Sequence, residues 1–372
     1  MAQSGLNMSR RIRRSPFTDK VEEYGVRGFS VVNHMLLPKS FETSVEDDYW
    51  HLREHVQIWD VGVQRQVQIT GADAARLVQM MTPRDVRQAK IGQCLYVPMI
   101  DEYAGMLNDP VLIKLADDKF WLSIADSDIL LWAKGLALGF KLNVTVEEPD
   151  VSPLAIQGPK ATALLAELFG EAIQDLGYFQ YGMFDVLGTR QLIARSGYSK
   201  QGGFEIYLQG GHLGSELWDM ICYAGQQYNI MPGCPNLIER IEGGLMSYGN
   251  EFTRENNPLE CGFEGICYFG DDIDYIGKSA LRKIYEQGPQ KLIRGIKFGG
   301  GKAPACGKPF PVTTYDGIHI GQITSGIYSP RLKCNVGMSM MAKGHWDFGT
   351  KLQVHTPDGK IREGIVSPMP FL

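Results

Sequence analysis

The stretch after about Lys291 constrains the fold most strongly. LIRGIKFGG, IGQITSGIYSP, VGMSMMAKG and TKLQVHTPDG are short segments at regular spacing, and Gly or Pro turns separate them. Short strands of this kind are typical of a small antiparallel barrel or sandwich. We therefore predict a β-barrel domain over residues 291–372, with a domain boundary near 285–292, at EQGPQK.

The rest of the chain mixes strand and helix patterns without the strict βαβ rhythm of a doubly wound sheet, which favours an α+β fold. VQRQVQIT, at 63–70, alternates apolar and polar residues and predicts a strand. Helical spacing is found at 73–81, 126–139, 216–228 and 236–249, and we expect the last helix to end at Gly249.

Composition excludes several classes of protein. The net charge is −5, and the only basic cluster is RRIRR at 10–14, which we interpret as a solvated tail segment. A nucleic-acid-binding face is therefore not expected. The seven cysteines are scattered without a CxxC pair, so neither a zinc site nor a disulfide framework is indicated. No apolar run suits a membrane span or a signal peptide, and we expect a cytoplasmic protein.

Two short motifs have simpler interpretations than catalysis. HLREH, at 51–55, places two imidazoles on one helix face, where they could bind a metal. No third ligand is apparent, so a surface helix is the favoured interpretation. FGGG, at 298–301, lacks the following helix that a phosphate loop requires, so we expect a turn.

The loop SGYSKQGG separates two apolar runs and leads into Glu205, which lies between Phe204 and Ile206. A carboxylate in such a segment is costly to bury unless it meets hydrogen-bond donors. It could pair with an arginine, or it could bind a planar donor pair such as the edge of a 2-aminopyrimidinone.

Two further charged residues have open roles. Asp109 precedes a proline at the start of a predicted strand, where it could form a turn or act in chemistry. Arg240, in IERIEGGLMSYGNE, could hold an anionic ligand or pair with Glu239 or Glu242.

Taken together, four stretches resemble the folate-dependent aminomethyltransferase family, which includes the T-protein of the glycine cleavage system. They are YVPMIDEYAGMLNDPV, ARSGYSKQGGFEIY, IERIEGGLMSYGNE with NPLECGF, and DYIGKSAL with GQITSGIYSPRL. The resemblance runs from about residue 30 to the end of the chain. It implies a three-domain cloverleaf around a channel that holds tetrahydrofolate, with domains at 1–150, 151–290 and 291–372.

The resemblance also implies site residues. Glu205 falls on the pterin-binding glutamate, and Asp109 falls on the aspartate beside the reactive folate nitrogens, which makes it the catalytic candidate. Arg240 falls near the folate and its acidic tail. The other implied folate contacts are Tyr96, Tyr198, Ser123, Ala125, Tyr178 and Met35.

Some stretches look more like the branch of this family that demethylates dimethylsulfoniopropionate (DMSP). They are RIRRSPFTDKVEEYGVRGFSVVNHMLLP, EHVQIWDV, SIADSD, PGCPNLIERIEGGL and NPLECGF. Two positions depart from ordinary T-proteins, since Lys200 and Ala125 stand where glycine and asparagine are usual.

This branch implies methyl transfer from a sulfonium to N5 of tetrahydrofolate, without a metal. A sulfonium would lie against aromatic faces. The candidates for substrate contact are Trp59, Tyr207, Phe204 and Tyr198, together with His34 and Leu36. Ordinary core packing is the alternative for the four aromatic residues, and it is the favoured interpretation for Trp59 and Phe204. Lys39 or Lys200 could bind the substrate carboxylate.

Three alternatives stay open: an aminomethyltransferase that acts with a lipoylated carrier protein, a demethylase of another onium compound, and a folate-binding factor without activity. Asp109 favours an enzyme. We expect the substrate and tetrahydrofolate as partners, without nucleic acid or membrane, and a homodimer is left open.

Overall fold

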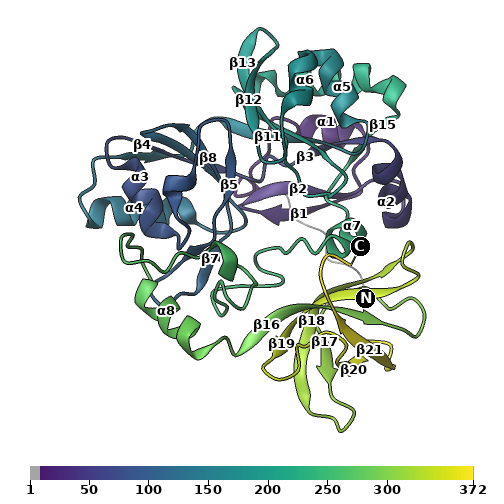
Figure 1. Cartoon of the computed structure of the whole chain (residues 1–372). Coiled ribbons are helices and arrows are strands. Elements are labelled where there is room, and N and C mark those ends of the chain that lie inside the picture. Colours follow the sequence, from purple (N-terminus) through teal and green to yellow (C-terminus); the bar gives the residue numbers. More distant parts are fainter. Residues whose placement is uncertain (1–8, 372) are drawn as a thin grey trace. The chain divides into compact units, whose positions relative to one another are not determined.

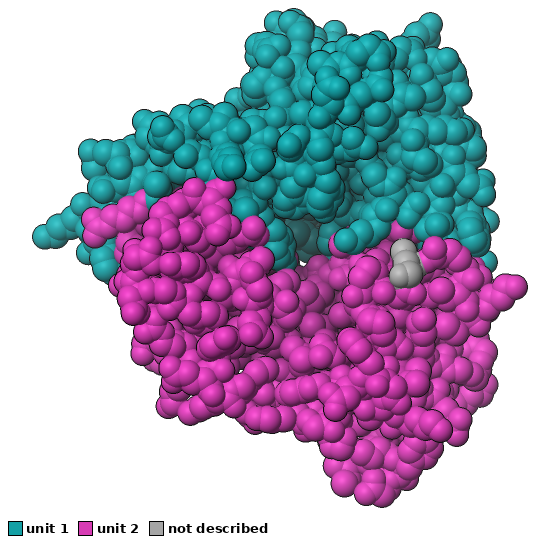
Figure 2. Space-filling view, viewed as in Figure 1, with its two compact units in different colours: residues 1–75, 89–96, 111–236 teal, residues 76–88, 97–110, 237–372 magenta. Residues whose placement is uncertain are grey.

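The computed structural model describes residues 9–371, and the chain forms two compact units (Figures 1 and 2). The first unit comprises Met1–Ala75, Ala89–Tyr96 and Val111–Asn236, and the second comprises Arg76–Gln88, Val97–Pro110 and Leu237–Leu372. Each unit is therefore assembled from segments that are far apart in the sequence.

The first unit contains two larger sheets and a hairpin. A six-stranded sheet has the order β12-β13-β14-β11-β3-β15, and a five-stranded sheet has the order β10-β4-β9-β8-β5. All neighbours are antiparallel except β15, which runs parallel to β3. The strands are β1 (Gly28–Val32), β2 (Met35–Ser40), β3 (Val56–Asp60), β4 (Gln66–Thr70), β5 (Cys94–Tyr96), β8 (Val111–Ala116), β9 (Lys119–Ser123), β10 (Thr145–Glu147), β11 (Val151–Gln157), β12 (Tyr181–Val186), β13 (Thr189–Ala194), β14 (Gly203–Gln209) and β15 (Ile230–Gly233).

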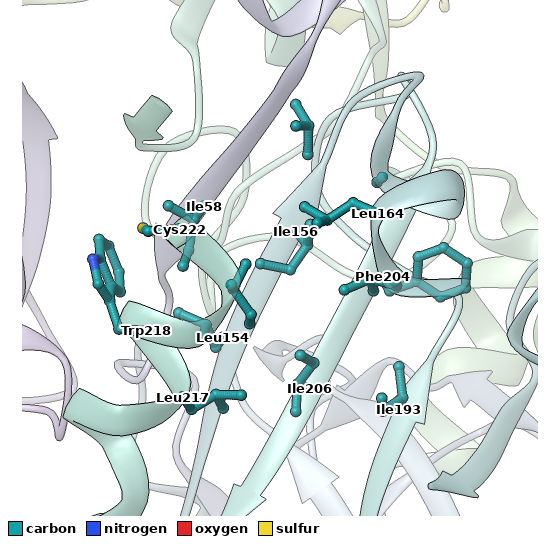
Figure 3. Close-up of a cluster of buried hydrophobic side chains, with 14 of the residues drawn as sticks. Ile58, Leu154, Ile156, Leu164, Ile193, Phe204, Ile206, Leu217, Trp218 and Cys222 are labelled. Atoms are coloured by element: carbon teal, nitrogen blue, oxygen red, sulfur yellow. The ribbon is translucent and has the colours of Figure 1, made fainter. Parts of the chain in front are cut away.

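Helices cover one face of the six-stranded sheet. The helices of this unit are α1 (Thr18–Glu23), α2 (Val45–Glu54), α4 (Ile129–Gly139), α5 (Ala161–Phe169) and α6 (Gly214–Gly225), with 3-10 turns η2 (Glu171–Asp175), η3 (Gly211–Leu213) and η4 (Gln226–Tyr228). Leu164 of α5 and Trp218 of α6 pack with Phe204 and Ile206 of β14 in one apolar core (Figure 3). The other face packs toward the five-stranded sheet, because Tyr207 of β14 shares a second apolar cluster with Trp121 of β9.

The second unit contains a closed six-stranded antiparallel barrel with the order β16-β19-β18-β17-β20-β21. Its strands are β16 (Lys291–Phe298), β17 (Phe310–Thr313), β18 (His319–Ser329), β19 (Cys334–Ala342), β20 (Lys351–His355) and β21 (Ile361–Ser367). The unit also has β6 (Met99–Ile100), β7 (Met106–Asn108), α7 (Leu237–Glu242), α8 (Lys278–Gln287) and the 3-10 turns η1 (Val86–Gln88) and η5 (Glu264–Ile266). Helix α3 (Ala74–Met81) spans the point where the chain passes from the first unit to the second.

These elements confirm the α+β class and the C-terminal barrel. The helix expected over 236–249 is wrong in its extent, because α7 ends at Glu242. Gly244 has a left-handed φ of 64°, and the amide of Leu245 donates to the carbonyl of Arg240, which closes the helix end. The basic cluster is also not simply solvated, since Arg13 pairs with Glu148 at 2.6 Å. The division into three domains stays a prediction.

Candidate functional site

Glu205 lies in the middle of β14, with its side chain on the face opposite the helices. Side chains alternate along a strand, so Phe204 and Ile206 enter the apolar core while Glu205 and Tyr207 lie on the other face. Glu205 is only 5% exposed. Its direct cross-strand neighbours are Ala194 and Ala155, two small residues that leave space beside the carboxylate.

The carboxylate of Glu205 is held by neutral groups. The Ser196 hydroxyl donates to Oε2 at 2.5 Å. Glu205 forms no ion pair with any residue in the described range 9–371, so the arginine pairing considered from sequence is not found there. Burial raises the pKa of the Glu205 carboxyl, and Ser196, Gln64 and Tyr207 oppose this rise. Hydrogen-bond donors supplied by a ligand would therefore stabilise the charged form of this buried acid.

A second layer of polar side chains adjoins Glu205. Gln66 donates to the Ser123 hydroxyl at 2.9 Å, which brings Ser123 into this cluster, and its contact with folate stays a prediction. Both Gln66 Oε1 and the Tyr207 hydroxyl are buried without a hydrogen bond of ordinary geometry among the described residues. Ser123 and Glu205 are nevertheless close enough to Tyr207 to affect the pKa of its hydroxyl. Burial first, and then the charge of Glu205, raise the pKa of Tyr207 well above its ordinary value.

Gln157 shapes the loop that carries Tyr198. Its amide nitrogen donates to the carbonyl of Ser196 at 3.1 Å, and its amide oxygen accepts from the Ser199 hydroxyl at 2.7 Å. A Cβ at Gly197 would lie 2.2 Å from the Gln157 amide, and a Cβ at Gly203 would lie 2.3 Å from the carbonyl of Ile156. Glycine is therefore required at both ends of the loop, where φ is 145° and 134°.

The predicted aromatic contacts occupy different environments. Tyr198 in the loop and Tyr96 in β5 are partly buried. Tyr178 exposes 70% of its surface. Partial desolvation of its hydroxyl, and then the charge of Glu205, raise its pKa. The folate contacts assigned to these tyrosines stay predictions.

Two other predicted aromatic contacts are core residues. Phe204 has no exposed surface and lies on the sheet face opposite Glu205, so a ligand on the Glu205 face would not meet its ring. Trp59 shares the face of Glu205 through Ala155, but it is 1% exposed and its indole N–H donates to Gln57 at 2.8 Å. These positions favour the core-packing interpretation for both residues, and we leave them out of the proposal below.

The predicted segment at 34–36 begins at a hairpin turn. Asn33 and His34 have φ of 50° and 60°, which matches a two-residue type I′ turn between β1 and β2. The amide nitrogen of the Asn33 side chain donates to the carbonyl of Ala125 at 3.0 Å and to that of Val63 at 2.9 Å. His34 is exposed at the tip, whereas Met35 and Leu36 are buried. The hairpin therefore ties the segment with Met35 to the segment with Ala125.

Asp109 and Arg240 belong to the second unit. Asp109 is half-buried and lies in the chain between β7 and β8. Its backbone N–H donates to the Asn108 side chain at 2.9 Å. Its carboxylate is also close enough to Cys261 to raise the pKa of that thiol, although burial is the largest cause. The catalytic role of Asp109 stays a prediction.

Arg240 forms a buried ion pair with Glu251, a partner that the sequence did not single out. The distance from Nη1 to Glu251 Oε2 is 2.7 Å, and the side chains are 8% and 0% exposed. The second guanidinium nitrogen donates to the Ser325 hydroxyl at 2.5 Å, so Arg240 joins α7 to the barrel strand β18. This arrangement gives Arg240 a structural role, and its contact with folate stays a prediction.

The two histidines of the HLREH motif have other partners. His51 Nε2 lies 2.9 Å from the carbonyl of Asn229, and His55 Nδ1 lies 2.8 Å from Lys160 Nζ. No cluster of three or more metal-binding side chains was found within residues 9–371. In the same range, no helix is both long and apolar enough to cross a membrane.

Sequence reasoning missed several residues of the Glu205 cluster. Ser196 was part of a recognised loop, but its role depends on how the loop folds back onto β14. Gln64 and Gln66 were visible as alternating polar positions of a predicted strand, which indicated their shared face but not what they approach.

Known proteins resemble the whole chain. The model of the GCVT N-terminal domain matches residues 17–270, and that of the glycine cleavage T-protein C-terminal barrel domain matches residues 295–372. Dimethylsulfoniopropionate demethylase DmdA of Ruegeria pomeroyi is 49% identical over 360 residues, which cover 96% of this chain and 98% of the relative. An aminomethyltransferase of Halalkalibacterium halodurans is 29% identical over 96% of this chain and 97% of the relative.

A solved structure agrees with the fold. The glycine cleavage system aminomethyltransferase T from Bartonella henselae matches with a TM-score of 0.84 and 24% identity, covering 97% of this chain and 98% of that one. The fold is thus shared along nearly the full length of both chains. The two family models, which match residues 17–270 and 295–372, show that the protein belongs to the glycine cleavage T-protein family.

Proposed function

We propose that this protein is a tetrahydrofolate-dependent DMSP demethylase. It transfers a methyl group from the sulfonium of DMSP to N5 of tetrahydrofolate and forms 5-methyltetrahydrofolate and 3-methylthiopropionate. The observation that carries the proposal is the 49% identity with a DMSP demethylase over nearly all of both chains. The aminomethyltransferases among the relatives reported above are much less similar, at 29% identity.

The cluster around Glu205 suits a reduced pterin. An aminopyrimidinone edge offers adjacent N–H donors, which a carboxylate can accept together. Glu205 has no cation beside it within the described residues, so such donors would relieve an otherwise costly buried charge. The buried hydroxyl of Tyr207 and the amide oxygen of Gln66 supply further polar contacts on the same side.

Asp109 is the proposed catalytic residue. The family resemblance assigns it to the region of N5 and N10, where it would orient the folate and accept the proton that N5 loses. A carboxylate can also stabilise the positive charge that develops on the nitrogen as the new bond forms. The hydrogen bond from its backbone to Asn108 fixes the main chain at this position.

The reaction needs little acid catalysis, because a sulfonium releases a neutral thioether. The main contribution is therefore the alignment of N5 with the methyl carbon. Tyr198 is the proposed aromatic contact for the sulfonium, worth about 0.5–2 kcal/mol. The ring of Tyr207 has no exposed surface and packs with Trp121, so we propose a contact through its hydroxyl alone. His34, Met35, Leu36, Tyr96, Ser123, Ala125 and Tyr178 stay proposed contacts of the ligands.

The test is a methyl-transfer assay with tetrahydrofolate and a panel of sulfonium and ammonium methyl donors. We expect 5-methyltetrahydrofolate with DMSP and a large loss of kcat in Asp109→Asn. Asp117→Asn is the matched control, because that carboxylate is 93% exposed and pairs only with Lys114. A betaine as preferred donor would move the assignment to another onium demethylase. Methylenetetrahydrofolate formed from an aminomethylated lipoyl carrier would assign an aminomethyltransferase instead.

A further inference from the structure

The Ser196 hydroxyl is the strongest contact of the Glu205 carboxylate. It lies 2.5 Å from Oε2, and Ser196 itself is 5% exposed. It is also the largest of the effects that lower the pKa of Glu205 against burial. Neutral groups, with Ser196 first among them, therefore hold a buried acid that has no ion pair among residues 9–371.

The backbone beneath this hydroxyl is fixed from inside the unit. Gln157 donates to the carbonyl of Ser196, and Gln157 also accepts from the hydroxyl of Ser199, three residues later. The absence of space for a Cβ at Gly197 shows how closely the loop follows the Gln157 side chain. The Ser196 hydroxyl is thus aimed at Glu205 by a rigid main chain.

Ser196 engages only one of the two carboxylate oxygens. Hydrogen bonding of Oε2 restricts rotation of the Glu205 side chain, since the serine cannot follow a moving acceptor. The small neighbours Ala155 and Ala194 do not offer a replacement donor from their side chains. Gln64 and Tyr207 act on the carboxylate less strongly, so the orientation of the acid depends mainly on the Ser196 hydroxyl.

We propose that Ser196 is a positioning residue, whose hydroxyl fixes Oε2 of Glu205 and so orients the carboxylate toward the pterin edge, while the remaining lone pairs of both oxygens stay available for the pterin N–H donors. This inference rests on the proposed function, because it assumes that Glu205 binds tetrahydrofolate. It adds a requirement for a hydroxyl at position 196, which the assignment of Glu205 alone does not contain.

The groups that face Glu205 define how its charge responds to pH. Tyr207 on the same strand, Cys94 on β5 and Tyr178 before β12 all sense its charge. Each of these groups has a raised pKa and stays neutral in the acid range. The titration of tetrahydrofolate itself is common to all variants, so a difference in the acid limb between wild type and a variant at position 196 reports on Glu205.

The experiment measures the affinity of the full chain for tetrahydrofolate by anaerobic calorimetry, without a methyl donor, from acid to neutral pH. Ser196→Ala should weaken binding by roughly tenfold or more, as expected for a lost hydrogen bond to a charged group. It should also move the midpoint of the acid limb to higher pH. Ser196→Thr keeps a hydroxyl and should restore both values toward wild type.

Ser199→Ala is the matched control. It removes another buried hydroxyl from the same loop, but that hydroxyl binds Gln157 rather than Glu205. We expect its acid midpoint to remain that of wild type, even if the protein melts at a lower temperature. An equal midpoint shift in Ser196→Ala and Ser199→Ala would overturn the inference and indicate general loosening of the loop.

Glu205→Gln separates the inference from the proposed function. Wild-type affinity in Glu205→Gln would refute the pterin-binding role of Glu205, and the positioning role with it. Weak binding in Glu205→Gln, together with wild-type affinity and midpoint in Ser196→Ala, would overturn the positioning role alone.

Discussion

Removal of Glu251 should destabilise the second unit strongly. The side chain of Glu251 is 0% exposed and accepts from Arg240 Nη1 at 2.7 Å, from the backbone N–H of Ser247 at 2.7 Å and from the Ser325 hydroxyl. Glu251→Ala leaves the Arg240 guanidinium buried beside an empty space. It also deprives Ser247 and Ser325 of their acceptor.

The size of the effect follows from this geometry. Breaking a buried ion pair by removing one partner costs about 3–5 kcal/mol, because the other charge is left uncompensated. Glu251→Gln keeps the shape and can still accept hydrogen bonds, so we expect a smaller loss. The double variant Arg240→Met/Glu251→Leu removes both charges and should recover much of the stability.

Urea unfolding, followed by circular dichroism, measures these free energies. Asp271→Ala is the control, because its pair with Arg282 is 90% and 39% exposed and should be worth less than about 1 kcal/mol. A loss below about 1 kcal/mol in Glu251→Ala would refute the view that this buried pair joins α7 to the barrel. A double variant as unstable as the single one would refute the charge-based explanation.

Three other predictions concern the first unit. The pKa of Glu205 is raised in the folded protein, so Glu205 favours folding below its unfolded pKa and loses this contribution as the pH rises through its folded pKa. Glu205→Gln should therefore raise the melting temperature of the free protein at alkaline pH. A gain in melting temperature that does not shrink on acidification would contradict this. Burial likewise raises the pKa of Asp60 from 3.8 to about 6, despite the Ser15 hydroxyl at 2.6 Å. The stability difference between wild type and Asp60→Asn should change between those pH values by at most about 3 kcal/mol, and a flat difference in chemical unfolding would count against it. Gly203→Ala should lower stability by roughly 2 kcal/mol or more because its Cβ meets the carbonyl of Ile156, and an unchanged urea midpoint would show that the strand adapts.

Local patterns predicted the elements better than the contacts between them. The regular spacing of short segments and Gly or Pro turns after Lys291 was sufficient for the barrel, because each strand is short and places alternate residues inside. In β14, side chains likewise alternate between the two faces of the sheet with a period of two residues. The same period puts Phe204 and Glu205 on opposite faces, which the interpretation of Phe204 as a ligand contact overlooked. The helix end at Gly244 was also signalled by its glycine pair, but the helical spacing beyond it was given more weight.

The candidate site was only partly readable from the sequence. A carboxylate among apolar neighbours marked Glu205, since such a group needs donors. The hydroxyl that supplies one of them depends on the register that pairs Ala194 with Glu205 and folds Ser196 back over the strand. The pairing of Arg240 with Glu251 likewise depends on the loop after α7, whose path no periodic pattern describes.

Gln157 supports the loop from below and leaves its exposed part free to vary. Its buried amide donates to the carbonyls of Ser196 and Phe204, which flank the 197–203 loop, while Lys200 is exposed in the loop with a φ of 57°. Substitutions at position 200 should therefore be tolerated, and a different side chain there should change the outer surface of the loop without moving Glu205.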